Sequence, residues 1–224
     1  MCGRFAIGLI SDPDWSDWLG LSVAADWPET GWNVAPSNTV GILRKTGAGR
    51  EIAPARWGLV PGWWKKPLAE MKATTFNARS EEAHRKPFFR DAWRHGRCLV
   101  PTIGYYEWTG PKSAKTPWFI TRKRNTPGFC MAGLWAEAHI EGQPLLSFTI
   151  LTTAAGNATR NLHPRSPVVI EEPDWETWIS AATEGHKLMR PIRNDQVEMW
   201  QVGRAVGNVR NDGPELINPV DPAA

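Results

Sequence analysis

The sequence lacks long apolar runs and has few cysteines. None of its 224 residues belongs to a run near the ~18 apolar residues of a membrane span, and no basic stretch followed by an apolar run resembles a secretory signal. Three cysteines (Cys2, Cys98 and Cys130) leave at least one unpaired, which is typical of a reducing compartment. We therefore expect a cytoplasmic protein without membrane contact.

Signatures of metal and cofactor sites are also missing. No Cys/His spacing matches a zinc site, so we expect neither a metal nor a cofactor.

Charge and tryptophan are what the chain has in excess. There are 14 tryptophans against two tyrosines, and the formal net charge is +3. Between residues 56 and 97 ten basic residues stand against four acidic ones, whereas the first thirty residues are acidic. Such sorting fits a phosphate-facing surface, although a solvated basic face would produce the same pattern.

The hydrophobic pattern predicts one α+β domain over residues 1–224. A short amphipathic helix is expected over residues 11–25, a helix capped by Ser80, a further helix ending at Gly96 and a late helix over 173–180. Short β-branched and aromatic runs predict strands around 40–45, 97–101, 103–108, 117–121, 128–137, 145–153 and 166–170. We expect a mixed or antiparallel sheet folded around a core, with peripheral helices.

The opening MCGRF places a cysteine directly behind Met1. Removal of Met1 would give Cys2 a free α-amine beside its thiol. An α-amine, with a pKa of about 7.7–8.0, can attack an aldehyde to form a Schiff base. The thiol can then add to the same carbon and close a thiazolidine ring. Arg4 offers a guanidinium fork for phosphate.

Three later stretches carry residues suited to proton transfer. In FNARSE, Asn77 and Arg79 share a face if the segment is extended; alternatively, they are a turn residue and a surface charge. In YYEW, Tyr105 and Glu107 share a face, and a carboxylate among aromatics suits acid–base work. In NLHPRSP, Pro164 restricts His163, a potential proton shuttle.

Two further features of these stretches would suit nucleic acid. Arg165, beside His163, is a candidate phosphate contact. GWWKKP joins Trp63 and Trp64 to two lysines, which fits a platform for stacking nucleobases.

Taken together, these stretches resemble the SOS-response-associated peptidase (SRAP) family of abasic-site processing proteins. The resemblance runs through the whole chain, in the family's order, by way of MCGRF, WNVAPSN, RWGLVPGWW, NARSE, RCLVPTIGYYEW, MAGLW, ILTTAA, HPRSPVVI and RAVGNVRNDGPELI.

The resemblance implies a barrel-like α+β fold and a covalent DNA-damage response. Cys2, exposed by autocatalytic or aminopeptidase removal of Met1, would crosslink abasic sites in single-stranded DNA through a thiazolidine. Asn77 would position the amine or the sugar, Glu107 would handle the amine's proton and His163 would assist ring opening. The remaining residues would hold flanking phosphates and bases: Arg4, Trp63, Trp64, Arg79 and Arg165.

The resemblance also bears on partners and on competing functions. It implies a monomer, associated with the nucleoid when bound to DNA, with replication-fork proteins as partners and a lyase activity as a side reaction. Pro164 departs from the acidic residue that many members carry after the histidine. Two alternatives stay open: an N-terminal-nucleophile cysteine peptidase or amidase, and a non-covalent single-stranded DNA-binding module.

Overall fold

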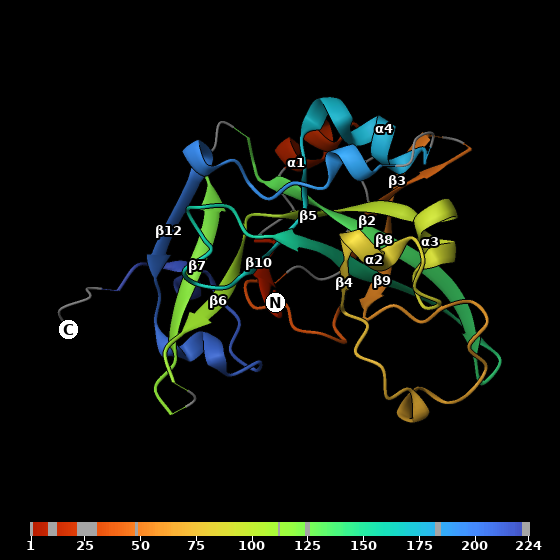
Figure 1. Ribbon diagram of the computed structural model, residues 1–224, viewed down its shortest axis with the longest axis horizontal. Helices are drawn as coiled ribbons and strands as arrows, with labels where there is room; N and C mark the ends of the chain where they lie inside the picture. Colours follow the sequence, from red (N-terminus) through yellow and green to blue (C-terminus); the bar gives the residue numbers. More distant parts are fainter. Residues whose placement is uncertain are drawn as a thin grey trace.

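The computed structural model describes residues 2–8, 13–21, 31–47, 49–111, 113–123, 126–181 and 185–220. Two β-sheets share one hydrophobic core, and short helices cover its outside (Figure 1). This confirms the expected α+β class with a barrel-like sheet. No helix in the described part of the chain is both long and apolar enough to cross a membrane.

The larger sheet closes on itself as a barrel. Hydrogen bonding runs in the order β9-β3-β2-β5-β8 and returns to β9. Of these contacts, β3 with β9 is parallel and the others are antiparallel. The five strands are β2 (Thr39–Thr46), β3 (Gly49–Trp57), β5 (Arg97–Thr102), β8 (Phe129–Ile140) and β9 (Gln143–Ala154).

Three short strands extend the barrel at its margins. β4 (Asn77–Arg79) runs parallel to β9, and β10 (Arg165–Pro167) pairs with the same strand in antiparallel register. β11 (Val169–Ile170) pairs with β8. Because β4 and β10 both lie against β9, the NAR and HPRSP stretches, more than eighty residues apart, meet at one place.

The second sheet is antiparallel and stands beside the barrel. Its order is β1 (Phe5–Ala6), β6 (Gly104–Thr109), β7 (Thr116–Arg122) and β12 (Val197–Gln201). Gly104 is required where β6 meets β7, since a Cβ there would collide with the ring of Phe119. The N-terminal residues lie between the two sheets (Figure 1).

The α-helices are short and flank the barrel. α1 (Pro13–Leu19) and α4 (Trp175–Ile179) touch through Trp18 and Trp175, whose rings are 4.9 Å apart. α2 (Ser80–Ala83) follows β4 directly, and α3 (Arg90–His95) precedes β5.

Single 3-10 turns complete the structure. They are η1 (Leu68–Glu70), η2 (Glu172–Asp174), η3 (His186–Leu188), η4 (Asn194–Gln196), η5 (Arg204–Gly207) and η6 (Pro214–Ile217).

Two details of the expected helices differ. The first helix covers Pro13–Leu19, while residues 9–12 and 22–30 lie outside the described part. Ser80 is the first residue of α2 and not its cap: Arg79 occupies the cap position without a side-chain hydrogen bond. Ser80 is instead buried, in a helix that packs on β9. The predicted helix end at Gly96 is confirmed.

Candidate active site around Cys2

Cys2 lies where the two sheets meet, with its side chain fully buried. On one side the backbone N–H of Tyr106, in β6, donates to the Arg4 carbonyl over 2.9 Å. On the other side Nδ2 of Asn77, in β4, donates to the Cys2 carbonyl over 2.6 Å. The start of the chain is therefore held by both sheets, and the position of Cys2 depends on their relative placement.

Glu107 approaches Cys2 from β6. Its carboxyl is buried, and this burial raises the pKa of Glu107 above the usual glutamate value. Burial, with the nearby Glu107 charge as a second cause, also raises the pKa of the Cys2 thiol. The thiol therefore stays protonated at neutral pH, so its reaction as a nucleophile requires a proton acceptor at the moment of bond formation.

His163 lies close enough for its charge to act on Glu107, since its cationic form lowers the pKa of that carboxyl. The histidine is oriented by the backbone two residues on. Its Nδ1 accepts a hydrogen bond from the Arg165 N–H over 3.0 Å and lies 3.1 Å from the Arg165 carbonyl oxygen. In the tautomer with a proton on Nδ1, that N–H donates to the Arg165 carbonyl and Nε2 is left to exchange a proton. The ring of His163 then keeps its orientation whether or not Nε2 carries a proton.

Tyr105 also lies at this site, as its position on the same face of the strand as Glu107 indicates. It is buried, and its hydroxyl hydrogen-bonds with Ser166 and Thr159. Burial raises the pKa of Tyr105, and Cys2 and Glu107 both contribute to the shift. A neutral phenol here connects the Cys2 pocket to the segment that carries His163.

Arg165, expected as a phosphate contact, is paired within the protein. Its guanidinium forms a bidentate ion pair with Glu81 of α2, at 2.6 and 2.8 Å. It also donates to the Thr152 carbonyl of β9. The bond from Arg165 holds the pKa of Glu81 below its usual value. Arg79, on the same strand as Asn77, is exposed.

Arg4 is likewise anchored inside the protein. Its Nη1 donates to Asn33 Oδ1 over 2.7 Å and to the Val206 carbonyl over 2.8 Å. Nδ2 of Asn33 reaches three carbonyls of the C-terminal segment, those of Val206, Asn208 and Asn211. The WN and RAVGN motifs thus meet in space and fix the Arg4 guanidinium.

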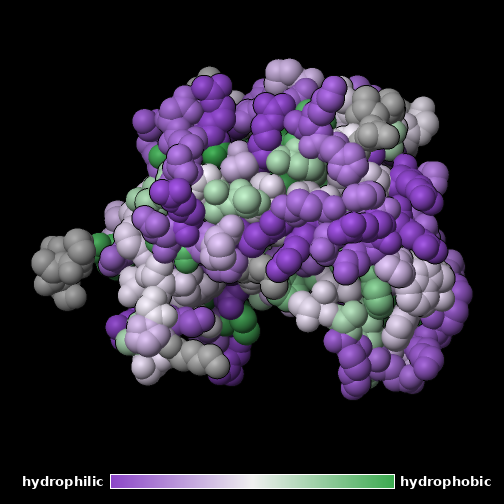
Figure 2. All heavy atoms as spheres, in the orientation of Figure 1, coloured by the Kyte–Doolittle hydropathy of each residue, from purple (hydrophilic) through white to green (hydrophobic). Residues whose placement is uncertain are grey.

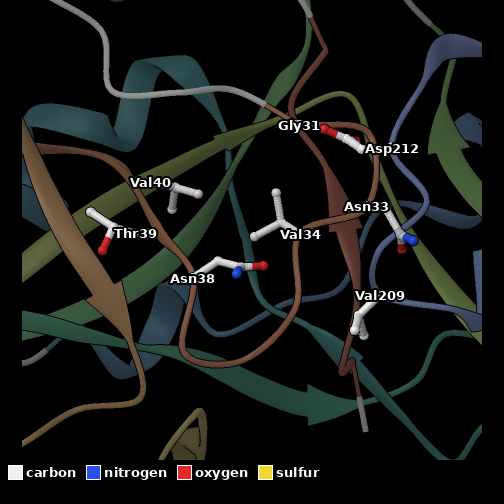
Figure 3. Close-up of a pocket in the computed structure, with 8 residues that line it drawn as sticks. All are labelled: Gly31, Asn33, Val34, Asn38, Thr39, Val40, Val209 and Asp212. Atoms are coloured by element: carbon white, nitrogen blue, oxygen red, sulfur yellow. The ribbon is translucent and has the colours of Figure 1, made fainter.

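A pocket of about 320 Å³ opens beside Asn33, between residues 31–40 and residues 209–212 (Figure 3). Val34, Asn38, Thr39 and Val40 supply one part of its lining, and Val209 and Asp212 supply another. The Asp212 carboxylate makes this pocket unsuited to a phosphate group.

Trp63 and Trp64 stand apart from Cys2, in the segment between β3 and β4. Trp64 packs near Val60, and its Nε1 donates to the Lys66 carbonyl. Trp63 is 49% exposed, so about half of its surface is accessible to a ligand. The structure adds Phe88, whose ring centroid is 5.3 Å from that of Trp63 and supports it edge-on. In the sequence, the only indication of this contact between Phe88 and Trp63 is the basic and aromatic composition of KPFF.

The structure therefore brings Cys2, Asn77, Glu107 and His163 together and keeps the tryptophans on a separate rim. Within the described residues, no group of three or more His, Cys, Asp or Glu side chains is arranged to hold a metal ion.

Several known proteins have sequences similar to this chain. Two are the abasic site processing proteins YedK of Escherichia coli, 32% identical over 98% of this chain and all of that protein, and YoqW of Bacillus subtilis, 32% identical over 97% and 99%. The abasic site processing protein HMCES of Gallus gallus is 30% identical over 77% of this chain and 58% of its own.

Solved structures agree in fold. A protein from Bacteroides thetaiotaomicron matches with a TM-score of 0.82 at 21% identity, covering 98% of this chain and all of its own. One from Bordetella bronchiseptica matches with a TM-score of 0.79 at 27% identity, covering 90% of this chain and all of its own. The family model of the SOS response associated peptidase (SRAP) matches residues 1–209. The chain belongs to the SRAP family.

Proposed function

We propose that this protein processes abasic sites in single-stranded DNA by forming a covalent crosslink through Cys2. The observation that carries the proposal is the placement of Cys2. It is buried between Asn77 on the barrel and Glu107 on the second sheet, with the oriented His163 acting on Glu107. The names of the relatives, abasic site processing proteins, support the same substrate.

The reaction begins with hydrolysis of the Met1–Cys2 peptide bond. One water is consumed, methionine is released, and the α-amine of Cys2 becomes free. Whether the protein or an aminopeptidase performs this step, the amine is the group that the crosslink needs. The Asn77 bond to the Cys2 carbonyl holds this residue in place during both stages.

Ring opening supplies the electrophile. An abasic deoxyribose exists largely as a closed ring, and the C1′–O4′ bond must break to expose the C1′ aldehyde. His163 donates a proton from Nε2 to O4′ while the C1′ hydroxyl loses its own proton to a solvent water. The Arg165 backbone keeps the imidazole oriented as its charge changes.

The Cys2 amine then attacks C1′, and loss of one water gives an imine. Glu107 accepts a proton from the amine at this stage. Its raised pKa suits it to return that proton later. The thiol sulfur adds to the imine carbon, the thiol proton passes to the imine nitrogen, and the thiazolidine closes.

Closure of the ring also explains why a protonated thiol is useful. An open imine permits β-elimination of the 3′ phosphate, which is a lyase reaction and cuts the strand. Addition of the thiol removes the imine and stops elimination. A buried thiol with a raised pKa keeps its proton until the imine forms, and that proton is then available to the nitrogen.

The test is the intact mass of the protein before and after incubation with an abasic oligonucleotide. The expected product is the Met1-free chain plus the oligonucleotide minus one water, stable to heat. Cys2→Ala, which keeps the amine and lacks the thiol, should give an adduct that survives only after borohydride reduction, together with strand cleavage. An equally heat-stable adduct with Cys2→Ala would overturn the mechanism.

A further inference from the structure

A second pocket is formed by residues of β6, β7 and η5 together with Arg4. It has a volume of about 400 Å³, and its lining is contributed by Arg4, Trp108, Lys115, Pro117, Arg204 and Gly207. The surface is hollowed at one edge of the molecule, between the part that carries β6 and β7 and the part that carries residues 58–76 (Figure 2). The pocket belongs to the first part and Trp63 to the second.

The charge of this pocket is positive without compensation. Among the described residues, its lining includes three cations and no carboxylate. Lys115 and Arg204 are exposed and have no ion-pair partner among the described residues. By contrast, Lys66 beside the tryptophans lies 3.6 Å from Glu70. A concave site of this charge attracts an anion.

The aromatic ring in the pocket narrows the class of anion. Trp108 is partly exposed and follows Glu107 directly in β6, and the Arg4 guanidinium lies 5.7 Å from its ring centroid. Cations around an indole suit a nucleotide, because the phosphate meets the charges while the base stacks on the ring.

The pocket is rigidly connected to Cys2. Arg4 is two residues from Cys2 and bonds to the Val206 carbonyl, which lies in the same 3-10 turn as Arg204. Asn33 holds this turn through its bond to Val206 as well. A phosphate bound by Lys115 and Arg204 would therefore have a fixed position relative to the Cys2 nucleophile.

We propose that this pocket, which we call the Lys115–Arg204 pocket, binds the lesion strand on the side of the abasic site away from Trp63. The inference rests on the proposed function and adds a second anchor to it. With one flank on the tryptophans and the other in the Lys115–Arg204 pocket, the abasic sugar spans the gap over Cys2. The ligand is a nucleotide unit of single-stranded DNA.

The test uses two abasic oligonucleotides that have flanking nucleotides on one side only, 5′ in one and 3′ in the other. The readout is the protein concentration that gives half-maximal crosslinking, measured across a range of salt concentrations. The double variant Lys115→Ala/Arg204→Ala is compared with Arg94→Ala/Lys187→Ala, which removes the same charge from exposed positions on α3 and η3. Thermal melting checks that each variant is folded.

We expect the pocket variant to weaken capture of one oligonucleotide only, whereas Trp63→Ala weakens capture of the other. For the sensitive oligonucleotide the plot of log affinity against log salt should become less steep by about 1.4, since each lost single-strand phosphate contact removes ~0.7 from the steepness. If the variant and the unaltered protein have equal affinity at 1 M salt, this change in slope makes the affinity of the variant roughly 25-fold lower at 0.1 M salt. The control pair should leave both unchanged.

Equal losses on both oligonucleotides, or no loss on either, would overturn the second anchor. If the loss appears only after a complementary strand is annealed to the sensitive flank, the phosphate comes from that strand and the assignment to the lesion strand is wrong. Failure of the unaltered protein to crosslink any abasic oligonucleotide would overturn the proposed function instead.

Discussion

The amide of Asn77 donates a hydrogen bond to the carbonyl of Cys2, 2.6 Å away and 75 positions earlier in the chain. This bond joins the N-terminal residues to the barrel, while Arg4, two residues on, is joined to the second sheet. Cys2 is thus held at a junction between sheets, and under the proposed function substitutions at either contact should change its reactivity.

Asn77→Asp tests that contact. Aspartate has no N–H to donate, and its oxygen would face the Cys2 carbonyl, leaving a buried acceptor unpaired. A loss of about 1–3 kcal/mol corresponds to a decrease of roughly fivefold to 150-fold in the crosslinking rate. Asn38→Asp is the matched control, because Asn38 is exposed and its Oδ1 accepts from the Ala35 N–H, which aspartate can also do. Equal rates for both variants would contradict the assigned role.

Glu107→Gln should raise the stability of the protein and lower its crosslinking activity. Burial raises the pKa of Glu107, so the folded protein binds this proton more tightly than the unfolded chain does. The stabilising contribution of the protonated group is complete at low pH and is lost as the pH rises through the raised pKa. At neutral pH the glutamine variant should therefore resist urea better than the unaltered protein, yet crosslink more slowly.

The crosslinking rate should also depend on the protonation of Glu107. With Glu107 as the base for the Cys2 amine, the rate should fall on the acidic side, beginning above the usual pH range of a glutamate. The glutamine variant should lose this limb. An unchanged acidic limb would show that another group accepts the proton.

Pro164→Ala tests the orientation of His163. The proline restricts the backbone of the preceding residue, and its removal adds about 0.4–1 kcal/mol of conformational freedom. We expect crosslinking to slow by roughly twofold to fivefold, with unchanged DNA affinity. An oligonucleotide that carries an acyclic aldehyde should restore the rate, because it needs no ring opening. Pro214→Ala, at an exposed position in η6, is the control.

Glu81→Gln should strengthen DNA binding. Arg165 would lose the carboxylate that neutralises it but keep its bond to the Thr152 carbonyl, so it stays oriented with an uncompensated charge. The salt dependence of binding should become steeper by about 0.7, as for one added phosphate contact. Glu82→Gln removes the same charge from the same helix next to Arg85 and Lys86, and serves as the control. Weaker binding by Glu81→Gln would mean that the ion pair positions Arg165 for DNA.

Asn33→Ala should lower the free energy of unfolding. The buried Asn33 amide pairs with three carbonyls and with Arg4, and alanine would leave these groups unsatisfied. The expected loss is about 2–4 kcal/mol in urea denaturation, since each buried unpaired group costs ~1–3 kcal/mol. Asn218→Ala, exposed near the end of the described chain, should change stability by less than ~0.5 kcal/mol.

Local sequence patterns were enough to predict the strands, while the roles of the site residues stay predictions. Alternation along YYEW placed Tyr105 and Glu107 on one face, and the structure confirms that both reach the Cys2 site. The paired tryptophans were expected on a basic loop, and Trp63 is exposed there. These features depend on neighbouring residues only, so periodicity and composition are sufficient to predict them.

The sequence by itself determined which groups the chain contains: a cysteine directly behind Met1, a carboxyl, a histidine and a set of cations. Only the tertiary structure decided what state those groups are in. Arg165 is neutralised by Glu81, 84 positions away, and Arg4 is held by Asn33 and Val206, whereas Lys115 and Arg204 have no carboxylate partner within the described part of the chain. Charge pairing, burial and the resulting pKa values depend on which distant segments meet. Sequence spacing does not contain that information, because the closure of the barrel brings those segments together.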